Sequence, residues 1–362
     1  MQEKTFFDML RFSLGITDKL DTSAGLPDWM ALLEQAEQQS LIGIMFSGIE
    51  RLPREQRPQD KETLFTWFAA AEMIRQTSKT VSEHTAALFA QMEADGLSCC
   101  LLKGQGNALL YPDPAMRTPG DIDVWVTQGG RLDVKGGIDY ARQHGDAGEI
   151  CYHHIDYGQF EGTDVELHFR PTFMHSPFNN RRLQRFFQEQ AATQLAHRKE
   201  IGGRLLSVPT TAFNSVYQLV HIARHLFQNG IGLRQIVDYY FVLRQGFSEA
   251  ERTSIVDTWK RCGLLQVAGA MMYVMQHLFR LDDAYLLVAP DERRGRFLLR
   301  EIMAGGNFGQ YDQRVSRFAR ETAVGRNWQR LVRDWRTAWL FPSESLWEPL
   351  FRIWHFFWRH SH

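Results

Sequence analysis

The chain has 362 residues, of which 44% are hydrophobic and 23% charged, so it can bury a sizeable core and has an ordinary globular composition. Lys and Arg number 41 and Asp and Glu 42, which leaves a net charge of -1. This balance argues against wholesale binding to nucleic acid, which usually leaves a basic footprint, but it leaves room for a local basic pocket around a phosphate.

The cysteines and the N-terminus bear on the cellular compartment. The four cysteines form no Cys-x-x-Cys motif, and we expect them to be small buried hydrophobes in a reducing compartment. Residues 1–15 carry charges and lack the apolar core of a signal peptide. No stretch approaches the apolar length that crosses a bilayer. We therefore expect a cytoplasmic protein without a transmembrane segment.

Residues 1–96 have the spacing of helices. A break with Pro53 and Pro58 precedes a long apolar-periodic stretch over residues 61–95, which stops at Gly96. We expect an N-terminal helical region here.

In residues 97–175 the helical spacing of apolar residues gives way to short apolar and alternating runs, which predict a small mixed β-sheet. A short helix is expected over residues 104–111, and the proline-rich segment that follows it predicts a loop. One candidate strand precedes Gly162 and another follows it, which predicts a hairpin. The expected strands, in chain order, are residues 98–102, 121–127, 150–160 and 164–170.

From about residue 176 the pattern is helical again, and we expect a C-terminal helical domain over residues 176–362. The tail is unusually aromatic, with Trp and Arg interleaved. Packing as core is its simplest interpretation, while a membrane surface or a homodimer contact is an alternative. The whole chain is therefore expected to be an α+β protein, with helical regions flanking a sheet domain at residues 97–175.

Strict alternation marks the strand at residues 121–127. Ile122 and Val124 share an apolar face, which forces Asp121 and Asp123 together onto the opposite face. Their α carbons should lie roughly 6.5–7 Å apart, close enough for both carboxylates to share ions.

The strand at residues 164–170 repeats this design. Val165 and Leu167 form its apolar face, and Glu166 and His168 lie on the other. If the two strands are neighbours in register, their carboxylates converge on one patch, where the ion that fits is Mg²⁺ (or Mn²⁺). Solvent-facing acids on a half-exposed sheet would give the same alternation.

Two basic residues lie upstream of the acids. Lys103 and Gly104 stand at a strand-to-helix turn, where glycine lets the backbone approach a phosphate. Arg117, in the loop before Asp121, could bind a triphosphate through two hydrogen bonds from its guanidinium. An ordinary turn and a salt bridge between Arg117 and one of the acids are the plainer alternatives.

Together these segments resemble the nucleotidyltransferases of the DNA-polymerase-β-like superfamily. More narrowly, they resemble an uncharacterised bacterial nucleotidyltransferase family whose turn reads Lys-Gly. The residues that carry the resemblance are Lys103-Gly104, Tyr111-Pro112, Arg117, Asp121-Ile122-Asp123, Glu166-Leu167-His168 and the helical segment from Gly232 to Asp238.

The resemblance implies a nucleotidyltransferase-type sheet, an NTP donor and a Mg²⁺ site. The broader superfamily usually has Gly-Ser or Gly-Gly at the turn, whereas here Gln105 follows Gly104. This departure puts the usual mode of triphosphate binding in question. The metal ligands and catalytic residues expected from the pattern are Asp121, Asp123 and Glu166, and the nucleotide-binding residues are Lys103, Gly104, Gln105, Arg117, His168, Arg234 and Asp238.

Other polar pairs have plainer interpretations. Arg234 and Asp238 are four residues apart, so a helix salt bridge explains them, although their helix end could also approach the nucleotide. His221 and His225 have the spacing of a metal pair but lack a nearby third ligand, which favours ordinary histidines.

The sequence supports one main functional hypothesis and two rivals. The main one is a Mg²⁺-dependent transfer of an NMP group from an NTP to a hydroxyl of a small molecule, sugar derivative or protein, with no long nucleic acid expected as acceptor. A non-catalytic nucleotide- or partner-binding module on the same fold is the second. A metallohydrolase built on His153, His154 and His168 is the third; in a regular strand only one of the first two can share the face of His168.

Overall fold

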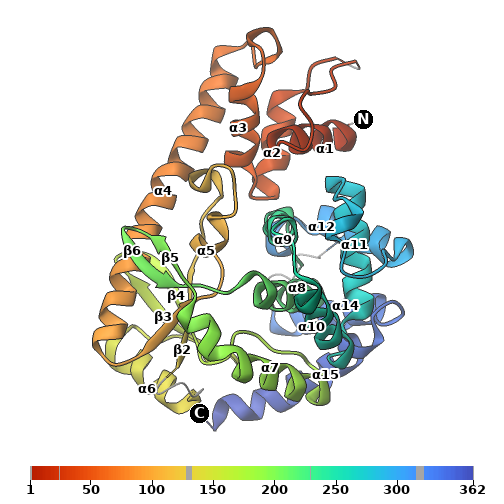
Figure 1. Ribbon diagram of the computed structural model, residues 1–362. Helices are drawn as coiled ribbons and strands as arrows, with labels where there is room; N and C mark the ends of the chain where they lie inside the picture. The colour runs from red at the N-terminus through yellow and green to blue at the C-terminus, as the bar shows by residue number, and fades with distance from the viewer. Residues whose placement is uncertain (1, 24, 128–132, 229, 315–321, 362) are drawn as a thin grey trace.

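The computed structural model describes residues 2–23, 25–127, 133–228, 230–314 and 322–361. It confirms an α+β protein in which a four-stranded sheet is flanked by helices (Figure 1). The strands are β1 (Ser98–Leu101), β2 (Ile122–Thr127), β3 (His154–Phe160) and β4 (Thr163–His168). The first three lie within the spans that the sequence predicts, and β4 begins one residue before its predicted start.

The sheet is mixed, with the strand order β1-β2-β4-β3. β1 pairs antiparallel with β2, and β3 and β4 form the expected hairpin. β2 and β4 are parallel neighbours, with Asp123 opposite Glu166. This pairing brings together the two strands that carry the acids.

Helices cover both faces of the sheet. Ile122, Val124 and Val126 share a core with α4 (Lys61–Ala94) and α6 (Val134–His144). On the opposite face Trp125 is fully buried and stacks on Phe213 of α8 (Thr211–Gln228), with ring centroids 5.9 Å apart. The acidic face is therefore a buried face lined by a helix, and the alternative of a solvent-facing strand does not hold for Asp123, which is 1% exposed.

The N-terminal and C-terminal helices share one hydrophobic core. Arg11 in α1 ties them together, because its Nε donates to the carbonyl of Leu278 in α11 at 2.7 Å. The division into three domains stays a prediction. The helices that contribute to this shared core, besides α4 and α8, are α1 (Gln2–Ser13), α2 (Trp29–Gln38), α3 (Ile42–Arg51), α7 (Pro177–Ala196), α9 (Leu233–Arg244), α10 (Glu249–Arg261), α11 (Leu265–Phe279) and α12 (Glu292–Gly305).

A second hairpin, β5 (Arg198–Ile201) and β6 (Arg204–Ser207), interrupts the predicted C-terminal helices. Its two-residue turn is Gly202-Gly203, with φ of 58° and 79°. Both residues of such a turn need positive φ, which glycine adopts without strain. The Gly-Gly pair was thus a signal that the helical interpretation overlooked.

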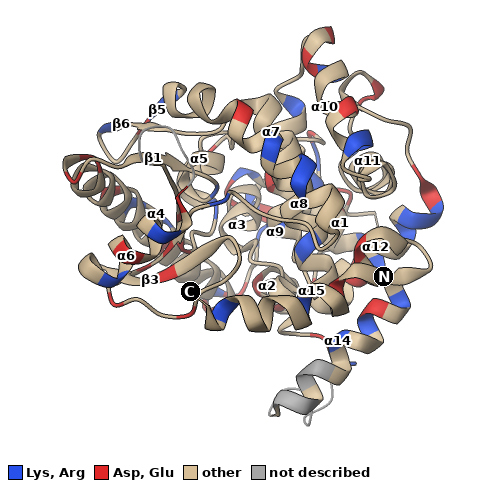
Figure 2. Ribbon diagram, turned by 90° about the horizontal axis from the view of Figure 1, so that it is seen from below, with Lys and Arg blue, Asp and Glu red and all other residues tan. Residues whose placement is uncertain are grey.

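The aromatic tail forms two helices, α14 (Ala323–Ala338) and α15 (Pro342–His360). Phe341 is buried, but Trp335 and Trp339 are 85% and 82% exposed, so the expectation of core packing fails for much of the tail. Asp334 and Glu348, in contrast, are buried. In the described part of the chain, no helix is both long and apolar enough to span a membrane. Figure 1 shows α15 along the lower edge of the molecule, and Figure 2 shows basic and acidic residues interspersed along the helices.

Candidate active site

The acidic side chains of β2 and β4 meet on the face that α8 covers. His168 joins them, because its Nε2 lies 3.0 Å from Asp123 Oδ1 and 3.2 Å from Glu166 Oε2. Parallel pairing places Asp123 and Glu166 on the same side of the sheet. The alternation of the two strands thus gives one cluster of carboxylates, as the pattern predicts.

Lys103 closes the cluster from the turn after β1. Its Nζ lies 3.0 Å from Asp123 Oδ1 and 3.9 Å from Asp121 Oδ2. Gly104 follows with φ of 62°, which lets the chain turn sharply into the short helix α5 (Gln105–Ala108). Burial alone would lower the pKa of Lys103, but Asp121, Asp123 and Glu166 raise it well above its usual value. Lys103 is therefore a fixed positive charge beside the acids.

The crowding of the carboxylates shifts their pKa values. Burial and the neighbouring Asp123 raise the pKa of Asp121, which Lys103 opposes. Burial also favours the neutral form of Glu166, but His154 and His168 together with Lys103 hold its pKa well below the usual range. The acids thus depend on nearby positive charge to stay ionised.

A third strand adds His154, which the sequence analysis placed in the alternative metallohydrolase site, and Asp156, which it did not assign to a site. In β3, His154 Nδ1 lies 3.2 Å from Glu166 Oε2, and its Nε2 lies 3.4 Å from Asp156 Oδ1. Burial lowers the pKa of His154 and His168, but the adjoining carboxylates raise each to about 9. The protonated rings supply positive charge at a position that a cation could also occupy.

Both His153 and His154 approach His168, which corrects the expectation that only one could. The ring centroids of His153 and His154 lie 5.2 and 5.1 Å from that of His168. Strict alternation does not apply to His153, because β3 begins at His154.

The cluster fits a divalent cation. Asp123 Oδ2 is buried and has no hydrogen-bond partner in the described structure. Asp123, Glu166 and His168 offer ligand atoms that all lie within 4.8 Å of one another, and Asp121 adds a carboxylate beside them. Carboxylate oxygens are what Mg²⁺ and Mn²⁺ prefer. His153, His154 and His168 form a second group of ligand atoms with the same spread, and imidazole suits a softer ion.

Arg117 and Asp238 lie in a buried network. Arg117 Nε and Nη2 donate to the two carboxylate oxygens of Asp238 at 2.8 and 2.7 Å. Asp238 also accepts from Tyr111 Oη at 2.6 Å and from Asn107 Nδ2 at 3.3 Å. The guanidinium and the carboxylate are thus engaged with each other, and they position the loop that leads to Asp121.

Arg234 has no carboxylate partner in the described residues, so the simple helix salt bridge with Asp238 is not formed. Its Nη1 donates to the carbonyls of Thr118 and Pro119 at 3.1 and 3.2 Å, and its buried Nε has no partner. A buried guanidinium that forms no direct ion pair and lies beside a cleft can contact a phosphate.

Gln105 points away from the acids. Its Nε2 donates to Ser82 Oγ at 2.6 Å and to the carbonyl of Ser78 at 2.9 Å, both in α4. Gln105 therefore anchors the Lys-Gly turn on α4, and this geometry does not support its expected contact with a nucleotide.

α8 contributes a polar stripe that the sequence analysis missed. Asn214, Tyr217, Gln218 and His221 recur with helical spacing in an otherwise apolar helix, and all are buried. Tyr217 Oη has no partner there. The spacing of these polar residues was the signal, because buried polar groups normally face partners or ligands. His221 and His225 lie close, but the described residues place no third metal ligand beside them.

A narrow cleft joins these parts. Its free volume is about 30 Å³, about the space of one water molecule. The acids still reach solvent, since 35% of the Asp121 and 28% of the Glu166 side chain is exposed. A nucleotide therefore requires the cleft walls to part. Its lining includes Lys103, Gly104, Arg117, Asp121, Asp123, Tyr217, His221, Arg234, Asp238 and Phe308.

Comparison with known families identifies the class of protein. A family described as an uncharacterised nucleotidyltransferase matches residues 26–280. The chain belongs to this nucleotidyltransferase family. The match spans the acid strands and the helices α8 and α9 that cover them, so it agrees with the resemblance in the sequence.

Two other comparisons add little to this family assignment. The crystal structure of an antigenic nucleotidyltransferase-like protein from Paracoccidioides brasiliensis is 16% identical, with a TM-score of 0.32 over 52% of this chain and 91% of that chain. Curated protein sequences include no match.

Proposed function

We propose that this nucleotidyltransferase moves an NMP group from an NTP to a hydroxyl of a small molecule, a sugar derivative or a protein, with Mg²⁺ or Mn²⁺ as cofactor. The observation that carries the proposal is Asp123, which lies opposite Glu166 and keeps a buried oxygen without a partner. Such an atom is costly unless a ligand satisfies it.

Asp121, Asp123 and Glu166 would hold the cation, with His168 at its edge. Divalent ions in such a site neutralise the phosphates and lower the pKa of an attacking hydroxyl. Glu166 would also accept a hydrogen bond from the acceptor hydroxyl, a role that the partial exposure of its side chain supports. His168 orients both Asp123 and Glu166 through its Nε2.

Lys103, Gly104 and Arg234 would contact the triphosphate. Lys103 already faces the acids, and the unpaired Nε of Arg234 borders the same cleft. In this proposal Arg117 and Asp238 act indirectly, since their mutual ion pair sets the position of the loop before Asp121. The Lys-Gly turn thus takes the place of the Gly-Ser turn that the broader superfamily uses.

The charge of the protein bears on the class of acceptor. The near-neutral charge and the interspersed charges of Figure 2 disfavour a long nucleic acid. A cytoplasmic location and a homodimer stay predictions.

The test is label transfer from each of the four α-³²P-labelled NTPs, with and without Mg²⁺, to a panel of hydroxyl compounds and to protein. We expect metal-dependent transfer that Asp123→Asn lowers at least about 10²-fold. Asp121→Asn removes a more exposed acid and checks that folding is not the cause. Asp164→Asn, which changes an exposed acid of β4, the strand that carries Glu166, is the control and should retain activity.

The results also separate the rival functions. NTP binding by calorimetry without any transfer would favour a non-catalytic module. Stoichiometric, tightly held zinc or iron that is lost in His153→Ala would favour a histidine-based metal site and contradict the proposal.

A further inference from the structure

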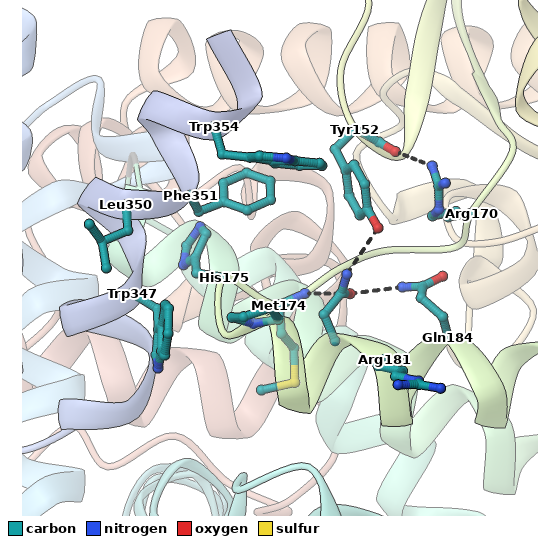
Figure 3. Close-up of a pocket in the computed structure, with 12 residues that line it drawn as sticks. Tyr152, Arg170, Met174, His175, Arg181, Gln184, Trp347, Leu350, Phe351 and Trp354 are labelled. Carbon is teal, nitrogen blue, oxygen red and sulfur yellow. Dashed lines mark hydrogen bonds between the residues drawn. The ribbon is translucent and has the colours of Figure 1, made fainter. Parts of the chain in front are cut away.

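A second cavity lies between α7, α15 and the start of β3 (Figure 3). Its volume is about 650 Å³, which is in the range of small-molecule sites. It is distinct from the acid cluster, because the rings of His153 and Phe173 lie between them: His153 is 5.2 Å from His168, and Phe173 is 4.8 Å from Phe351 in the cavity wall.

One part of the cavity is aromatic. Tyr152 makes edge contacts with Phe351 and Trp354, at centroid distances of 5.7 and 5.5 Å, and Trp347 lies on the same helix as the last two. Figure 3 shows Leu350 and Trp347 at the end of the cavity remote from the arginines. This end offers apolar contacts and few hydrogen bonds.

The other end is cationic. Figure 3 shows Arg170 and Arg181 there, and no carboxylate lines the cavity among the described residues. Arg170 Nη1 donates to the carbonyl of Tyr152 at 2.6 Å, and its guanidinium lies 4.3 Å from the Tyr152 ring centroid. Neither arginine has an ion-pair partner in the described structure. Their charge is available to an anion.

The uncharged polar groups of the wall are largely occupied by one another. Asn180 donates to Tyr152 Oη at 3.1 Å and accepts from Gln184 at 3.0 Å and from the Met174 amide at 3.2 Å. These bonds hold the wall in place, so recognition of a ligand falls to the arginines and to the aromatic rings.

The apolar end continues onto the surface of α15. Leu346, Leu350, Ile353 and Phe357 recur at helical spacing and are between 57% and 67% exposed. Because Leu350 belongs both to this stripe and to the cavity, an apolar ligand can extend from one to the other. Contiguous exposed apolar side chains are a common feature of binding surfaces.

We propose that the cavity binds an amphipathic anion, with a phosphate or carboxylate group at Arg170 and Arg181 and an alkyl or aromatic body against the α15 rings. The opposed cationic and aromatic ends match the two halves of such a molecule. The site does not depend on nucleotidyl transfer, so it stands or falls separately from the proposed activity.

Calorimetric titration of the full chain with decyl phosphate, below its micelle concentration, tests the proposal. We expect one molecule bound per chain. Inorganic phosphate lacks the body and decyl maltoside lacks the charge, so each should bind about ten-fold more weakly or worse. Arg181→Gln and Arg170→Gln should each weaken decyl phosphate by a similar factor. Arg185→Gln, on the same helix but lining a different cavity, should not.

A second pair of protein variants tests the contact with the apolar body of the ligand. Trp354→Ala should weaken the binding of decyl phosphate. Trp339→Ala, which replaces an exposed tryptophan directly after α14, should leave this binding unchanged. Flotation with phosphatidylglycerol vesicles separates the two sources of such an anion. Flotation that Arg181→Gln abolishes identifies a membrane lipid, and decyl phosphate binding without flotation identifies a soluble ligand.

Two results would overturn the proposal. One is the absence of both decyl phosphate binding and vesicle flotation. The other is decyl phosphate binding of equal affinity in Arg181→Gln and Arg185→Gln, since this would place the anion elsewhere. Arg181 is exposed, so its replacement leaves the fold intact.

Discussion

Replacement of Asp238 by Asn distinguishes a structural from a ligand-binding role for two residues that the sequence assigned to the nucleotide. In the structure, Asp238 is the buried counter-charge of Arg117 and accepts four hydrogen bonds, two from Arg117 and one each from Tyr111 and Asn107. Asn keeps the shape but removes the charge and one acceptor atom. The guanidinium of Arg117 would then be buried without its counter-charge.

The expected cost is large. Both side chains are 4% exposed, so solvent screens their interaction little. Breaking a buried ion pair by removal of one partner typically costs about 3–5 kcal/mol, because the remaining charge is uncompensated. We expect Asp238→Asn to lower the free energy of unfolding by about this amount. The double variant Arg117→Met/Asp238→Asn should recover part of it, because it buries no unpaired charge.

Urea unfolding followed by circular dichroism gives the four free energies of the cycle. Calorimetry with NTP and Mg²⁺ then measures binding in each variant that remains folded. A loss below about 1 kcal/mol in Asp238→Asn, together with loss of NTP binding, would refute this reasoning. Arg117 and Asp238 would then be nucleotide ligands, as the resemblance implied.

The remaining predictions address the cleft, the turn and the tail. Arg234→Gln should raise the KM for NTP about ten-fold or more without abolishing metal binding, measured by steady-state kinetics; an unchanged KM would exclude Arg234 from phosphate contact. Gly104→Ala should lower the free energy of unfolding by about 1–2 kcal/mol in urea, because alanine resists φ of 62°, and a stabilised variant would contradict this. Burial and the neighbouring carboxylate of Glu348 raise the pKa of Asp334 to about 8, above its unfolded value. The contribution of protonated Asp334 to stability is therefore complete below about pH 4 and is lost as the pH rises towards 8. The melting temperature should fall as the pH rises through this window, and it should fall less in Asp334→Asn.

The strands of the site could be predicted because their two faces differ in chemistry. Alternation in β2 and β4 separates acids from apolar residues, and this rule holds wherever a strand is regular. It failed at His153, which precedes β3. The sequence analysis had to assume that β2 and β4 are neighbours, because no local pattern specifies strand pairing. The tertiary fold shows that they pair.

Other features depend on contacts that no local pattern specifies. Gln105 and Arg117 have side chains suited to a phosphate, but their partners come from α4 and α9, far away in the chain. The cavity beside α15 combines Tyr152 just before β3, Arg170 just after β4, and residues of α7 and α15, and only folding brings them together. The polar stripe of α8 was visible in the sequence but could be interpreted only once the helix lay over the acids.

The central claim is that the acids of β2 and β4 form one metal site, and electron paramagnetic resonance of Mn²⁺ tests it most directly. The account predicts that the 362-residue chain binds Mn²⁺, that Asp123→Asn and Glu166→Gln both abolish this binding, and that Asp164→Asn retains it. Undiminished Mn²⁺ affinity in Glu166→Gln would contradict a site shared between the two strands.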